Sequence, residues 1–103
     1  MNLIQHFVDG KVFKGTSKRT GKVFNPSTGE QSSEVSFATT NDVNETVSVA
    51  KKAFIDWSQK TPLFRARVLF KFKELIEKNS DKLTKIIVSE HGKVYGDAQG
   101  SLT

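Results

Sequence analysis

The two histidines are the first residues to consider for chemistry, because a neutral imidazole can ligate a metal ion or act as a general base. His6 and His91 are 85 positions apart, and neither has a second histidine at a metal-ligand spacing. His91 follows Glu90 directly, so on a helix these two side chains point in different directions. We interpret His91 as a residue near a helix C-terminus, where it interacts favourably with the helix dipole.

Other reactive patterns are also absent from the sequence. The chain has no cysteine, which excludes a thiolate nucleophile, a thiolate metal site and a disulfide. No Ser, His and acid combination has the spacing of a nucleophilic site, and there is no G-x-G-x-x-G. Gly92-Lys93 lacks the preceding glycine of a phosphate-binding loop. The residues alone therefore assign no catalytic, cofactor-binding or metal-binding residue.

A basic cluster with interleaved aromatics is the best candidate for nucleic-acid contact. Its cations are Arg65, Arg67, Lys71, Lys73, Lys78, Lys82 and Lys85. Phe64, Phe70 and Phe72 lie among them, but the spacing of Phe70 is typical of a core residue. Three acids interrupt the basic field: Glu74, Glu77 and Asp81. We interpret the cluster as a solvated helix surface, with a small basic nucleic-acid-binding protein as the alternative.

Strands and turns are predicted for the first 38 residues. Asp9-Gly10 lies between the apolar pairs 7–8 and 12–13, which indicates a hairpin with a type I′ turn. A polar loop over 15–21 leads to a short strand at 22–24. The segment 25–30 reads as a turn, and the alternation at 33–37 predicts a half-buried strand. Two hairpins are therefore expected.

From Thr39 the apolar period becomes helical. Thr39 or Thr40 is expected to cap a first helix that ends near Ser58, with Asp42 and Glu45 in its first turn. Its apolar face would carry Val43, Val47, Ala50 and Phe54, widened by Thr46, Ala53 and Trp57. Phe54 and Trp57 are interpreted as core residues.

Two or three more helices follow. Thr61-Pro62 predicts the start of a second helix, whose apolar positions are Ala66, Leu69, Phe70, Leu75 and Ile76. Ser80 with Asp81 is expected to cap a third helix that ends at Gly92. Residues 94–103 read as the beginning of a fourth helix with no stop signal.

Composition limits the molecule to one small α+β unit. There are 103 residues, with 16 Lys and Arg against 11 Asp and Glu, for a net charge of +5. The hydrophobic fraction of 36% is low for a free-standing domain, so we expect a thin core or apolar contacts outside the chain. No segment resembles a signal peptide or a membrane span, and we expect a cytoplasmic protein.

Five segments, in order, resemble the aldehyde dehydrogenase superfamily. Phe7-Val8-Asp9-Gly10-Lys11 is similar to its "F-I-(N/D)-G-(K/E)", and Phe24-Asn25-Pro26-Ser27-Thr28-Gly29-Glu30 contains its "N-P-x-T-G-E". The run 42–57 resembles "D-V-x-x-A-V-x-A-A-K-x-A-F-x-x-W". Arg65 with Leu69 fits "R-x-x-x-L", and Glu90-His91-Gly92-Lys93 fits "E-x-G-K".

Within the superfamily, the run 65–76 and Asp97-Ala98-Gln99-Gly100 look most like the methylmalonate-semialdehyde dehydrogenase branch. That branch oxidises malonate or methylmalonate semialdehyde with NAD and transfers the acyl group to coenzyme A. The chain departs from the family pattern at Ser101, where Asp or Glu is usual. It also carries Thr46, where Ala is common, and Ser48.

The resemblance implies that the chain is the N-terminal segment of an α/β aldehyde dehydrogenase. It would comprise a hairpin region at 1–38 and a helical region at 39–103. The family's catalytic cysteine, glutamate and asparagine, and its NAD-binding strands, lie downstream of this region. We therefore expect no site residue, no bound cofactor and no activity from the chain alone. The alternative is a non-catalytic module that pairs with an intact dehydrogenase, or self-associates into a homo-oligomer.

Overall fold

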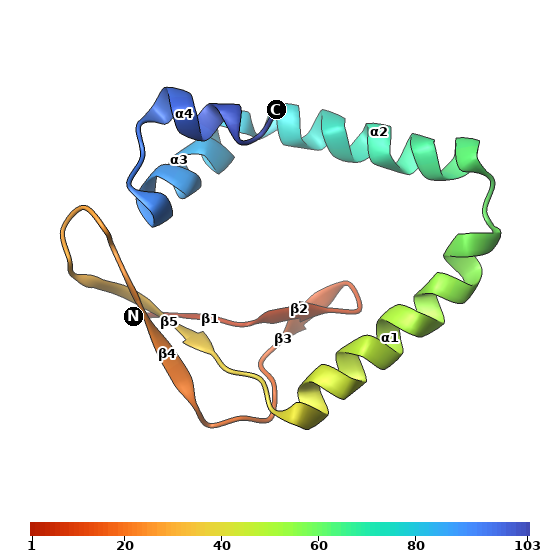
Figure 1. The fold of residues 1–103 in the computed structure, drawn as a ribbon, viewed down its shortest axis with the longest axis horizontal. Helices are drawn as coiled ribbons and strands as arrows, with labels where there is room; N and C mark the ends of the chain where they lie inside the picture. The colour runs from red at the N-terminus through yellow and green to blue at the C-terminus, as the bar shows by residue number, and fades with distance from the viewer. The chain divides into compact units, whose positions relative to one another are not determined.

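The N-terminal region forms a three-stranded sheet in which its first strand pairs with its last. The computed structural model describes all 103 residues. Its sheet has the order β1 (Asn2–Ile4), β5 (Gln31–Ser36), β4 (Thr20–Phe24), and β1 runs parallel to β5 (Figure 1). The amide of Asn25 donates to the carbonyl of Glu30 at 2.8 Å, which closes the turn between β4 and β5. The strand β1 was not among the predicted elements.

A separate two-stranded ribbon is formed by β2 (His6–Val8) and β3 (Lys11–Phe13). The strands are antiparallel, with Phe7 opposite Val12. Asp9 and Gly10 have φ values of 56° and 75° at the turn. These are the positive φ angles that a type I′ turn requires, so the predicted hairpin is confirmed.

The first two helices begin at the predicted caps. The side chain of Thr39 accepts from the amide of Asp42 at 3.0 Å and opens α1 (Thr40–Gln59). Thr61 caps α2 (Pro62–Lys78) by accepting from the amide of Phe64 at 3.1 Å. Proline at the first helical position loses no hydrogen bond, because an amide at this position has no partner within the helix. This explains why α2 begins at Pro62.

The last two helices, α3 (Ser80–His91) and α4 (Tyr95–Gly100), follow after short breaks (Figure 1). Asn79, rather than Ser80, precedes α3, and no side-chain cap bond forms there, so the predicted Ser80 cap is wrong. Gly92 ends α3 with φ 84°, as predicted. The fourth helix ends at Gly100, contrary to the expectation that it has no end within the sequence.

The contacts divide the chain into two units. The first contains residues 1–23 and 31–60, and the second contains residues 24–30 and 61–103. Together they form the predicted α+β arrangement of strands followed by helices. None of the helices is long and apolar enough to cross a membrane.

The apolar core within the chain is very small. Ala98 is the only buried hydrophobic residue. The interpretation of Phe54, Trp57 and Phe70 as core residues is wrong for this chain, since their exposed fractions are 65%, 37% and 68%. Helical spacing identifies the faces that a helix prefers to bury, but it does not supply the surface that covers them.

Candidate functional site

The most strongly held polar side chain is the carboxylate of Asp42, which is only 3% exposed. The amide of Thr16 donates to both of its oxygens, at 3.2 and 3.1 Å. The Thr16 hydroxyl donates to Oδ1 at 2.9 Å, and the Thr39 amide donates to Oδ2 at 3.0 Å. Asp42 therefore ties the loop between β3 and β4 to the start of α1.

These donors also decide what Asp42 can do chemically. Backbone hydrogen bonds from Thr39 and then Thr16 lower the pKa of Asp42 from 3.8 to about 2. A carboxylate with so little affinity for protons is a poor general base near neutral pH. Its role is to fix the loop and the helix N-terminus.

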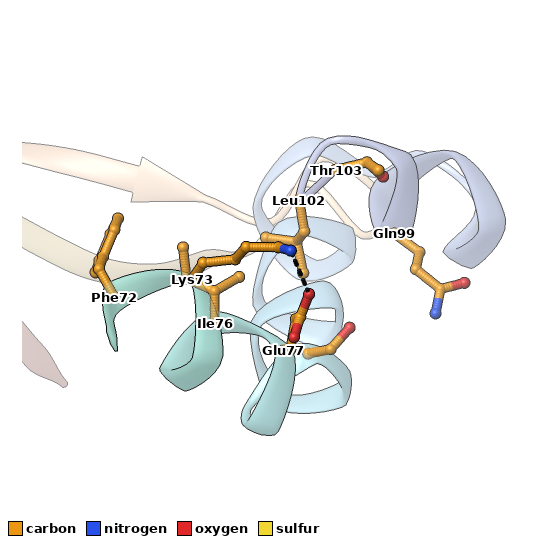
Figure 2. Close-up of a pocket in the computed structure, with 8 residues that line it drawn as sticks. Phe72, Lys73, Ile76, Glu77, Gln99, Leu102 and Thr103 are labelled. Atoms are coloured by element: carbon orange, nitrogen blue, oxygen red, sulfur yellow. Dashed lines mark ion pairs between the residues drawn. The ribbon is translucent and has the colours of Figure 1, made fainter. Parts of the chain in front are cut away.

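A hollow of about 410 Å³ lies in the second unit, between the C-terminal half of α2, the start of α3 and the end of α4. Figure 2 shows Leu102 reaching toward Lys73 and Ile76 of α2. Lys73 pairs with Glu77 at 3.5 Å on the same helix. The lining residues are Phe72, Lys73, Ile76, Glu77, Ser80, Gln99, Leu102 and Thr103. The lining mixes apolar and polar side chains and contains one internal ion pair, an arrangement that is suited to packing rather than to bond chemistry.

The two histidines do not form a site. His91 is the exposed last residue of α3, which is the predicted helix C-terminal position. Nε2 of His6 is buried without a hydrogen-bond partner, and its ring centroid lies 6.1 Å from that of Phe13. No group of three or more His, Asp or Glu side chains could hold a metal ion.

The basic cluster is partly neutralised by neighbouring acids. Lys71 pairs with Glu74 at 3.3 Å, Lys73 pairs with Glu77, and Lys85 pairs with Asp81 at 2.8 Å. These contacts support its interpretation as a solvated helix surface, because three of its seven cations already have an acidic partner.

Polar contacts hold α4 to α3. The Tyr95 hydroxyl donates to Asp81 at 2.7 Å. The hydrogen bonds from Lys85 and then Tyr95 lower the pKa of Asp81. The hydrogen bond to Asp81 in turn raises the pKa of Tyr95. Lys93 donates to the Ser101 hydroxyl at 2.7 Å and lies 3.8 Å from the Asp97 carboxylate. This network is structural, since each group is bound to another group of the same unit.

Comparison with known protein families identifies the family to which this fold belongs. The sequence model of the aldehyde dehydrogenase family matches residues 13–103. The chain belongs to the aldehyde dehydrogenase family. In this chain, the turn at residues 25–30 and Gly92 belong to the same unit. A Cβ placed at Gly92 would lie 3.1 Å from Cγ of Pro26.

Similar aldehyde dehydrogenases include semialdehyde enzymes. The malonate-semialdehyde dehydrogenase of Pseudomonas aeruginosa is 37% identical over 99% of this chain and 20% of its own length. The methylmalonate-semialdehyde dehydrogenase structure from Oceanimonas doudoroffii is 41% identical, with TM-score 0.94, over 99% of this chain and 21% of its own. A Sinorhizobium meliloti protein described as a methylmalonate-semialdehyde dehydrogenase, complexed with NAD, is 41% identical, with TM-score 0.93, over 97% of this chain and 20% of its own.

The chain thus spans about a fifth of the length of the aldehyde dehydrogenases it matches. Its fold follows theirs closely over that fifth. Sequence reasoning missed the Asp42–Thr16 contact, and only the capping-box spacing from Thr39 to Asp42 hinted at a special role for that carboxylate.

Proposed function

We propose that this chain is the N-terminal segment of an NAD-dependent dehydrogenase that oxidises malonate or methylmalonate semialdehyde and transfers the acyl group to coenzyme A. The observation that carries the proposal is the 37% identity over 99% of the chain to a malonate-semialdehyde dehydrogenase of which it spans 20%. Residues 1–38 would serve as its hairpin region and residues 39–103 as its helical region.

The binding sites for NAD and coenzyme A are proposed to lie in the other four-fifths of the parent enzyme. The residues of this chain do not fit either cofactor, because the chain has no glycine-rich phosphate loop and Lys73 in its hollow is paired with Glu77. The chemistry also needs a thiolate that attacks the aldehyde, and the chain has no cysteine. We expect the isolated chain to produce no NADH from malonate semialdehyde, NAD and coenzyme A. NADH formation by the purified chain would refute this.

A covalent chimera tests the assignment to the parent enzyme. The matched segment of the Pseudomonas aeruginosa malonate-semialdehyde dehydrogenase would be replaced by this chain. We expect the chimera to fold and to form NADH from malonate semialdehyde. A chimera that folds but forms no NADH would contradict the assignment of the chain to this parent, and one that never folds would contradict the structural assignment.

The second candidate function is a non-catalytic module that pairs with an intact dehydrogenase or with another copy of itself. The exposed apolar side chains favour it, because such surfaces mark sites of association. A stable complex with the full-length Pseudomonas aeruginosa enzyme in size-exclusion chromatography would support this function. Co-elution would be absent if the chain acts only as a covalent segment. The predicted cytoplasmic location remains a prediction, which cell fractionation would test.

A further inference from the structure

The helix α2 lacks any buried residue although it is 17 residues long. Val68, Phe72 and Leu75 follow one another at i, i+4 and i+7, with exposed fractions of 45%, 60% and 45%. A hollow of about 580 Å³ runs along these side chains. Most of the stability of a helix in a protein comes from packing of its apolar face, so α2 needs a surface that covers this face.

Large apolar side chains also occupy the opposite side of α2. Phe70 is 68% exposed and Leu63 is 59% exposed. At 3.6 residues per turn, Phe70 points about 200° away from Val68 around the helix axis. A helix that is apolar on several sides is typical of the interior of a larger protein. A second copy that packs on one side would leave the other side uncovered.

Each relative contains a much larger part outside the matched segment, which we call the dehydrogenase body. The matched segment is 20% of the Pseudomonas aeruginosa enzyme and 21% of the Oceanimonas doudoroffii structure, whose fold it follows with TM-score 0.94. In such a protein the other four-fifths lie outside the matched segment. They are large enough to enclose one helix from two sides.

We infer that this chain, as a separate polypeptide, docks non-covalently through α2 onto an aldehyde dehydrogenase body that lacks its own matched segment. The inference rests on the proposed function, because it takes the occupant of the α2 surface from the family. It goes further, since it requires no peptide bond between the two parts. The apolar faces of α2 would supply the binding energy, without the high effective concentration that a covalent link gives.

Co-expression tests the inference directly. The full chain, residues 1–103, would be produced with the Pseudomonas aeruginosa malonate-semialdehyde dehydrogenase lacking the segment that the chain matches. We expect the two polypeptides to co-purify and to form NADH from malonate semialdehyde, whereas neither part alone does so. Val68→Asp combined with Phe70→Asp should weaken the complex at least about a hundredfold, because each change would leave a carboxylate unpaired in an apolar interface.

Lys78→Asp on the same helix is the matched control, because it introduces the same residue at a polar, exposed position. It should leave the complex within about twofold of the original, as expected for an exposed charge outside an interface. Equal helical circular dichroism of the variants would show that the loss is not unfolding.

The covalent chimera described above separates the two possible failures. An active chimera with no complex in trans would overturn the inference and leave the proposed function standing. A chimera that is inactive because the parts do not fit would overturn the proposed function itself. A complex that forms equally well with the Val68→Asp, Phe70→Asp variant would show that α2 is not the docking element.

Discussion

At the residue scale, Asp42 is the side chain that gathers several polar contacts of the first unit, since its carboxylate accepts four hydrogen bonds. It accepts from Thr16 and from Thr39, residues that lie 26 and 3 positions away in sequence. A carboxylate is required because both oxygens accept. An asparagine retains one oxygen and would turn its amide toward a donor.

Asp42→Asn is therefore expected to lower the melting temperature of the chain, by about 5 °C or more. Asp56→Asn is the matched control, since the Asp56 side chain is 82% exposed and lies 3.8 Å from Lys60. It should change the melting temperature by less than about 2 °C. Thermal unfolding followed by circular dichroism at low concentration checks both, and equal shifts would contradict the role given to Asp42.

The pH dependence of stability gives an independent test of the same residue. The folded pKa of Asp42, about 2, lies below its ordinary value of 3.8. Its contribution is therefore fully present above about pH 4 and is lost as the pH falls toward 2. The difference in stability between the original chain and Asp42→Asn should shrink over that window. A difference that stays constant from pH 6 to pH 2.5 would show that the charge of Asp42 is not what matters.

Two glycines should respond to alanine in opposite directions. A Cβ at Gly21 would lie 2.6 Å from Cζ of Phe37, so Gly21→Ala must displace this exposed ring from its contacts and should destabilise by about 1 kcal/mol. A Cβ at Gly96 meets nothing within 4 Å in α4, so Gly96→Ala should stabilise by about 0.5–1 kcal/mol. Urea unfolding measures both, and changes of the same sign would count against this packing.

At the element scale, the C-terminal end of α4 is held by Lys93, which lies in the link between α3 and α4. Lys93 donates to the hydroxyl of Ser101, the C-cap residue of α4, at 2.7 Å. Ser101→Asp should add a charged acceptor for Lys93 and stabilise the end of α4 by up to about 0.5 kcal/mol at low salt. The gain is small because an acid near a helix C-terminus opposes the helix dipole. Urea unfolding at low and high salt checks it. A gain that survives 1 M salt would not come from this ion pair.

The elements that depend on local sequence were predictable. The Asp9-Gly10 turn, the Thr39 and Thr61 caps and the Gly92 terminator appear where their residue types favour them. The strand β1 was missed because three residues at 2–4 carry little alternation, and their strand state comes from pairing with β5, about 30 residues away. The predicted Ser80 cap was wrong because Asn79 alone separates α2 from α3. No side-chain hydrogen bond caps the start of α3.

At the scale of the whole molecule, the site around Asp42 could not have been predicted from the sequence, because it depends on a contact with Thr16, which lies 26 positions away. The sequence did predict the family, from five short motifs. It also predicted a thin core, from its hydrophobic fraction of 36%. Apolar spacing indicates the face that a helix prefers to bury, but it does not show what covers that face. The core prediction for Phe54 and Phe70 was therefore wrong, since both are exposed in this chain.

The isolated chain is therefore expected to associate with itself as its concentration rises. With Ala98 as the only buried hydrophobic residue, and with Val68 and Phe70 exposed on opposite sides of α2, apolar surface is available in several directions. Contacts between different surfaces of two copies do not form a closed dimer, so they produce oligomers with a range of sizes. Sedimentation velocity over a hundredfold range of concentration should show broad, concentration-dependent species. The Val68→Asp, Phe70→Asp variant should shift them toward the monomer. A single monomeric species with a sharp melting transition, unchanged over that range, would mean that the chain covers its own apolar faces in solution.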